Sequence, residues 1–138
     1  MMDHIFAMLG TALPNLLLQL GVTALLLGLG VLIYQAITPF DERRLIGQGN
    51  KAAGIVFGAS VLALAIPLAA TLATTTVLID IVIWGVIALV VQLVTLVVIS
   101  LVFRGMKRQI EADNVAAAFG LAAAQIAVAL LNAGAVAG

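Results

Sequence analysis

The chain contains no cysteine, a single histidine and very little charge. Without cysteine it forms no disulfide and has no thiolate for catalysis or metal binding. Charged residues make up 9% of its 138 residues and apolar residues 64%, whereas about a quarter of the residues of a soluble domain are charged. Because so few polar groups cannot cover a surface in water, the composition predicts a membrane protein with one domain, residues 1–138.

The scarcity of reactive side chains also excludes most chemistry. An enzyme needs a nucleophile or a metal together with a base and an orienting group, and here the six acids and His4 are scattered along the chain. We therefore expect no enzymatic activity, no catalytic residue, no metal site and no cofactor. The net charge is zero and the cations form two clusters, so nucleic acid is not an expected partner.

Long apolar stretches predict four membrane spans. Each is roughly 23 residues long, or about 35 Å as a helix, which crosses a hydrocarbon core of about 30 Å with some tilt. Backbone groups in lipid must be paired within the segment, so we expect an all-α membrane protein with four transmembrane helices. The predicted spans are residues 15–37, 51–73, 80–103 and 115–137.

The N-terminal region is too long for one span, because a helix over residues 5–37 would measure about 50 Å. Pro14 fits the first turn of a helix. We therefore expect a break there, with residues 3–12 lying in the membrane interface. A cleaved signal peptide is the alternative, but a positively charged start is missing, since Asp3 and His4 are the only polar residues before Thr11.

The chain repeats itself with an offset of 64 residues. Of the 53 residues from Gly21 to Ala73, 16 are identical to the residue 64 positions later, where the composition predicts about six. We interpret this as two tandem helical hairpins, residues 15–74 and 79–138. Because each unit contains two spans, the units should point the same way, as a parallel repeat about a pseudo-two-fold axis along the membrane normal.

The basic residues predict the orientation. All of them flank the two hairpin turns within the repeats, and the termini and the middle turn have none. By the positive-inside rule, both turns face the cytoplasm and both termini lie outside. The turns are either solvated and held by anionic lipids, or they dock a cytoplasmic protein. The residues concerned are Glu42, Arg43, Arg44, Arg104, Lys107 and Arg108.

Several motifs resemble a known family. The run ITPFDERRLIGQGNKAAG, the proline of AIPLAA and a second N-x-A-A beginning at Asn114 are similar to the YjfL-like family of small bacterial inner-membrane proteins, a four-span domain of unknown function. The resemblance covers about residues 30–138. It implies a multi-pass protein of the bacterial inner membrane. Similar proteins tend to be encoded near envelope stress proteins, but the resemblance implies no reaction.

Polar residues within the spans are further candidates for function. Gln92 and Gln125 each lie about 17 Å from the expected cytoplasmic boundary. They either hydrogen-bond to each other between helices or line a hydrated cavity. Asn132 in the last span is another candidate. Asp80 either complements the dipole of the third span or binds a cation at the outer mouth.

Two asparagines occupy matching positions in the two units. Asn50 and Asn114 each precede an alanine-rich span and are placed to cap its first turn. The alternative is that they hold an anion or a lipid head group at two helix N-termini. Glycine and alanine at four-residue spacing in these spans allow close helix packing and favour a homo-oligomer.

Together these features predict a non-enzymatic, homo-oligomeric inner-membrane protein that acts as a scaffold linked to envelope stress. The alternative is an oligomeric channel or transporter for ions or small solutes, lined by Gln92 and Gln125. Proton coupling is not expected, because the amides of these two residues do not titrate.

Overall fold

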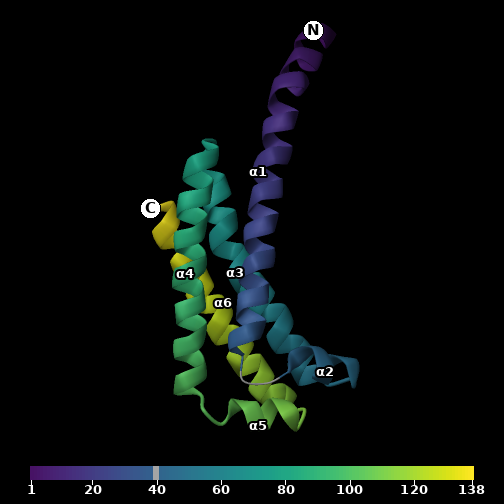
Figure 1. Ribbon diagram of the computed structural model, residues 1–138, viewed down its shortest axis with the longest axis vertical. Helices are drawn as coiled ribbons and strands as arrows, with labels where there is room; N and C mark the ends of the chain where they lie inside the picture. Colours follow the sequence, from purple (N-terminus) through teal and green to yellow (C-terminus); the bar gives the residue numbers. More distant parts are fainter. Residues whose placement is uncertain (39–40) are drawn as a thin grey trace.

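The computed structural model describes residues 1–38 and 41–138, which form four long and two short helices (Figure 1). The four long helices are each long and apolar enough to cross a membrane. The predicted all-α membrane architecture with four spans is therefore confirmed. In chain order the helices are α1 Met2–Ile37, α2 Glu42–Gly47, α3 Lys51–Thr74, α4 Leu78–Val102, α5 Met106–Glu111 and α6 Val115–Ala137.

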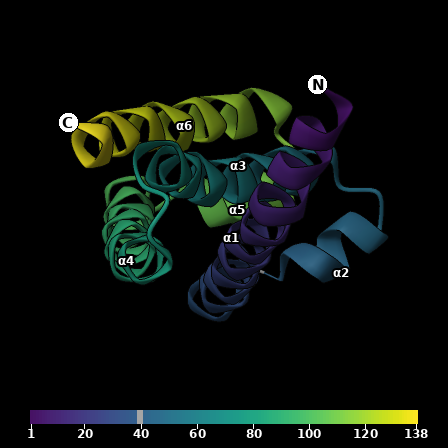
Figure 2. The same ribbon diagram turned by 90° about the horizontal axis from the view of Figure 1, so that it is seen from above.

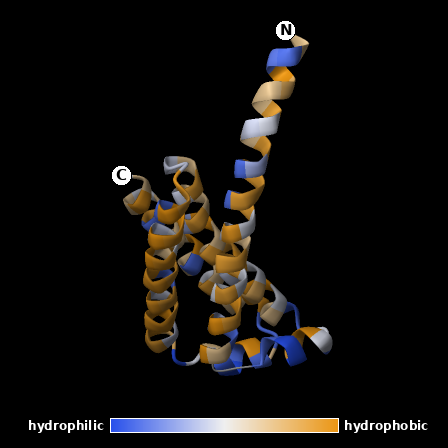
Figure 3. Cartoon of the chain, turned by 45° about the horizontal axis from the view of Figure 1, so that its top comes forward, coloured by the Kyte–Doolittle hydropathy of each residue, from blue (hydrophilic) through white to orange (hydrophobic). Residues whose placement is uncertain are grey.

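The two short helices lie together at one end of the molecule, and both termini lie towards the other (Figure 1). Figure 3 shows hydrophilic residues concentrated around α2 and α5, while the long helices are mainly apolar. We call residues 41–50 and 103–114 the charged end. Neither α2 nor α5 was predicted, because a helix of six residues is too short to show a hydrophobic period.

The central helix is α3. Viewed from above, it lies between α6, α4 and α1 (Figure 2), and it contacts all three, most extensively α6. Helices in lipid associate through close packing, since no hydrophobic effect drives them together. Small buried side chains make this approach possible. They are Ala52, Ala53, Ala59 and Ala63 on α3, and Ala118, Ala122 and Ala129 on α6.

Two glycines bring α1 and α4 close together. A Cβ atom added at Gly30 would lie 2.8 Å from Leu89 Cδ2, and one added at Gly85 would lie 2.8 Å from Leu26 Cδ1. Each glycine thus accommodates a leucine of the opposite helix. At Gly28, one half-turn away on α1, a Cβ would meet nothing within 4 Å.

Helix α1 runs without interruption through Pro14, so the predicted break there is wrong. Proline removes one backbone N–H, but side chains on both sides of it bond to nearby carbonyls. Thr11 Oγ1 donates to the carbonyls of Ala7 and Met8, at 3.2 Å each, and Asn15 Nδ2 donates to the Thr11 carbonyl at 3.3 Å. The N–H that is missing at Pro14 would have bonded to the Gly10 carbonyl, which is not among these acceptors.

The N-terminal part of α1 projects beyond the other helices (Figure 1). Gln19 Nε2 donates to the carbonyl of Thr76, between α3 and α4, at 2.8 Å. This bond marks the level of the turn between α3 and α4. Residues 2–18, which we call the N-terminal projection, add about 25 Å of helix beyond it. The interfacial location of residues 3–12 stays a prediction.

Structural features recur at the 64-residue offset. Helices α2 and α5 have six residues each and begin 64 residues apart, and α3 and α6 also begin 64 residues apart. Gly49 and Asp113, which precede α3 and α6 at equivalent positions, both have positive φ, of 81° and 59°. The two charged turns therefore follow the same path.

We predict that Gly30→Val destabilises the fold by roughly 1–3 kcal/mol, because the added methyl groups would displace Leu89. Gly28→Val is the matched control, and its effect should stay within about 1 kcal/mol. Unfolding of the purified variants in detergent, followed by circular dichroism, measures both values. Equal losses at the two positions would contradict the close α1–α4 contact.

Candidate functional site at the charged end

The two predicted asparagines lie at the N-termini of α3 and α6. Asn50 Oδ1 accepts a hydrogen bond from the backbone N–H of Ala53 at 2.8 Å, and Asn114 Oδ1 accepts one from Ala117 at 3.1 Å. Each bond satisfies an N–H group that has no partner within its own helix. Both asparagines therefore have the geometry of helix caps.

Asn50 additionally joins the two charged turns. Its Nδ2 donates to the carbonyl of Ile110 at 2.8 Å and lies 3.4 Å from that of Glu111. Asn114 Nδ2 instead donates to Gln109 Oε1 within its own turn, at 2.6 Å. The equivalent asparagines thus differ, because one links segments 60 residues apart and the other makes local bonds.

Asp113 completes this link and was not identified from the sequence. Its Oδ1 accepts from the N–H of Ala52 at 2.9 Å, so a residue of the second turn caps the helix that follows the first turn. Aspartate tolerates the left-handed backbone conformation that this position requires. A sequence pattern reveals caps that adjoin their helix, and Asp113 lies 61 residues away from Ala52.

Glu42 is buried, so its predicted place in a solvated turn is wrong. Its side chain is 3% exposed, because α2 folds back against the end of α1 and against α3. The Tyr34 hydroxyl donates to Glu42 Oε1 at 2.7 Å, and Oε2 has no hydrogen-bond partner among the described residues. Burial raises the pKa of the Glu42 carboxyl to about 7, although the bond from Tyr34 lowers it in part.

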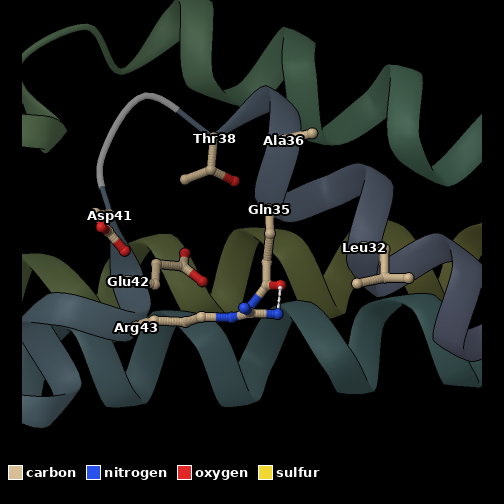
Figure 4. Close-up of a pocket in the computed structure, with 7 residues that line it drawn as sticks. All are labelled: Leu32, Gln35, Ala36, Thr38, Asp41, Glu42 and Arg43. Atoms are coloured by element: carbon tan, nitrogen blue, oxygen red, sulfur yellow. Dashed lines mark hydrogen bonds between the residues drawn. The ribbon is translucent and has the colours of Figure 1, made fainter.

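Glu42 lines a cavity of about 500 Å³ at the end of α1 (Figure 4). Thr38 and Asp41 also line it, and Arg43 Nη2 donates to Gln35 Oε1 at 2.9 Å on its wall. In the described ranges, no three His, Cys, Asp or Glu side chains come close enough to hold a metal ion. The cavity thus combines a buried carboxyl with amide and hydroxyl groups.

The basic residues of the charged end are all exposed. Within residues 1–38 and 41–138, no arginine or lysine lies within 4.0 Å of a carboxylate. Arg104 and Lys107 line a second pocket, of about 320 Å³, between the ends of α1 and α4 and helices α5 and α6. The exposed cations are Arg43, Arg44, Arg104, Lys107 and Arg108.

The predicted polar residues of the spans are buried and bond to neighbouring helices. Gln125 Oε1 on α6 accepts from Ser60 Oγ on α3 at 3.2 Å. Asn132 Nδ2, also on α6, donates to the Ala88 carbonyl on α4 at 3.3 Å and lies 3.4 Å from Gln92 Oε1. The two glutamines thus bond to different partners and not to each other. Gln92 Nε2 has no partner in the described part of the chain.

Asp80 lies at the opposite end of the molecule from the charged end, in the first turn of α4. Its side chain is half-buried. A carboxylate in the first turn complements the positive end of the helix dipole. Asp80 is therefore separate from the acids and bases of the charged end.

Residues 8–136 match the model of one protein family, described as Domain of Unknown Function (DUF350). The matched region contains the whole of α2 to α5 and nearly all of α1 and α6. The match confirms the resemblance to a family of unknown function that the sequence motifs indicated. No curated protein and no solved structure matches the chain significantly.

We predict that Asn50→Ala costs more stability than Asn114→Ala. The Asn114 variant loses one cap, worth about 1 kcal/mol. The Asn50 variant loses a cap and the bonds between the turns, worth together about 2–3 kcal/mol. Unfolding midpoints and slopes in detergent give both values, and a larger loss at Asn114 would argue against the link between the turns.

We also predict that stability falls as the pH rises from about 4.5 to 7. Below the ordinary Glu42 pKa of 4.5 the carboxyl is protonated in both the folded and the unfolded state, whereas above the folded value of about 7 the folded protein holds a buried charge. The total loss should be about 3 kcal/mol. Thermal unfolding between pH 4 and 8 measures it.

Glu42→Gln should abolish this pH dependence, because the amide keeps the acceptor for Tyr34 and does not titrate. Glu111→Gln, an exposed acid at the second turn, is the matched control and should keep the wild-type slope. If the stability of Glu42→Gln still falls with rising pH, another titrating group causes the effect.

Proposed function

The chain belongs to the DUF350 family, and on that basis we propose that it is a non-enzymatic scaffold of the bacterial inner membrane that assembles into a homo-oligomer. The N-terminal projection is the observation that carries this proposal. Helices α3 and α4, of 24 and 25 residues, already match the thickness of a bilayer, whereas α1 has 36 residues. The projection is therefore a surface of α1 that no other helix of the single chain covers (Figure 1).

The side chains of the projection are mainly apolar, and its few polar residues are Asp3, His4, Thr11 and Asn15. Phe6, Leu9, Leu13 and Leu16 are among the exposed large residues of α1. An exposed apolar patch marks a surface that contacts either another protein or the membrane. A second copy of the chain brings the same helix to the same level along the bundle. Contact between projections would bury both surfaces at once, as symmetric oligomers do.

We also propose how the chain arose and how it is oriented in the membrane. The recurrence of α2 and α3 as α5 and α6 supports a tandem duplication with the two units parallel. The exposed arginines and lysines of the charged end support a cytoplasmic location for it, with both termini outside. The resemblance to YjfL-like proteins makes envelope stress the setting in which such a scaffold would act.

The buried amides favour a scaffold over a channel. Gln92 has an exposed fraction of 0%, and both Gln92 and Gln125 contact polar side chains of neighbouring helices. A pore lined by these glutamines would require both to leave their partners and turn outward. As links between helices they stabilise the bundle without any such change.

Cysteine cross-linking tests the scaffold proposal, because the natural chain has no cysteine. We expect Leu9→Cys and Leu16→Cys to form disulfide-linked dimers in native membranes under mild oxidation, since both positions lie on the projection. The control is Leu131→Cys, whose side chain is 74% exposed on α6. Dimer yield on a non-reducing denaturing gel should be several-fold higher for the projection variants. Yields no higher than for the control would overturn assembly through the projection.

A further inference from the structure

The pocket beside Arg104 and Lys107 changes from apolar to charged along the length of the bundle. Its walls include Leu96 and Leu101 of α4, Ile37 of α1 and Leu121 of α6. Arg104 lies just beyond the end of α4 at Val102, and Leu96 lies six residues before that end, about 9 Å along the helix. The apolar wall thus lies within the membrane-spanning region, and the cations lie where the spans end.

The hydroxyl groups of this pocket already donate to partners within the protein. Tyr34 donates to Glu42 Oε1 at 2.7 Å, Thr38 Oγ1 to the Tyr34 carbonyl at 2.6 Å, and Ser100 Oγ to the Leu96 carbonyl at 3.0 Å. Arg104 and Lys107 pair with no carboxylate in the described ranges. The pocket therefore presents two positive donors at its charged end.

We infer that this pocket is a binding site for one anionic phospholipid. The head-group phosphate binds Arg104 and Lys107, and an acyl chain lies along α4 towards Leu96. Charge complementarity selects an anionic head group, because a zwitterionic lipid brings its own cation to a site that is already positive. The apolar wall selects a lipid over a water-soluble anion, which would leave that wall uncovered. This site is independent of the contact between N-terminal projections.

Lipid titration of the delipidated full-length protein, followed by native mass spectrometry, tests this inference. The probes are phosphatidylglycerol and phosphatidylcholine with the same acyl chains, and glycerol phosphate as the head group alone. We expect one tightly retained phosphatidylglycerol, much weaker retention of phosphatidylcholine, and no displacement of the lipid by millimolar glycerol phosphate. Displacement by glycerol phosphate would replace the lipid site with a simple anion site.

Two charge-matched double variants separate a pocket from a diffuse positive surface. Arg104→Gln with Lys107→Gln should weaken phosphatidylglycerol binding about 30-fold, at about fivefold for each cation. Arg44→Gln with Arg108→Gln removes the same charge from exposed positions outside the pocket and should weaken binding at most threefold. Equal weakening by both pairs would overturn the pocket.

Ser100→Phe tests the acyl part of the site without changing the charge. The phenyl ring would fill the pocket and should weaken phosphatidylglycerol binding at least tenfold, with helix content and lipid-free unfolding temperature unchanged. Unchanged affinity in a folded Ser100→Phe protein would exclude an acyl chain from the pocket. If this variant does not fold, the displacement experiment with glycerol phosphate still tests whether the acyl chain contributes to binding.

Discussion

The close packing of α3 against α6 is the contact on which the rest of the structure depends. The first N–H groups of α3 have no acceptor within that helix. Asn50 accepts from Ala53 and Asp113 of the other charged turn accepts from Ala52, while Asn50 Nδ2 donates across to the Ile110 carbonyl. Buried alanines then allow the two helices to approach along their length. With α3 and α6 fixed, α4 packs against both, and α1 against α3 and α4.

The sequence predicted the spans well, because a helix that crosses lipid must be apolar over its whole length. It predicted much less of the structure at the charged end. Helices α3 and α6 begin where Asn50 and Asn114 indicated. The continuity of α1 through Pro14 was not predictable from local propensity, since proline inside a helix usually breaks or kinks it. The burial of Glu42 arises from tertiary packing, which a charged turn in the sequence does not reveal.

The two charged turns have a common path but different chemistry. Positions 64 residues apart carry Glu42 in the first turn and Met106 in the second, and Tyr34 likewise corresponds to Val98. Only one of the two turns can therefore bury a carboxyl beneath a tyrosine. The second turn instead places Arg104 and Lys107 beside an apolar pocket. A shared backbone with divergent side chains gives one site for a proton and another for an anionic lipid.

Tyr34 belongs to both of these sites. Its side chain lines the pocket proposed for the lipid, and its hydroxyl donates to Glu42 in the neighbouring cavity. A lipid that moves the tyrosine ring also removes a hydrogen bond that stabilises the ionised carboxylate, and loss of that bond raises the pKa of Glu42. By the reciprocity of linked equilibria, ionisation of Glu42 then changes the affinity for the lipid by the same factor. A lipid that displaces Tyr34 would therefore couple its own occupancy to the protonation of Glu42.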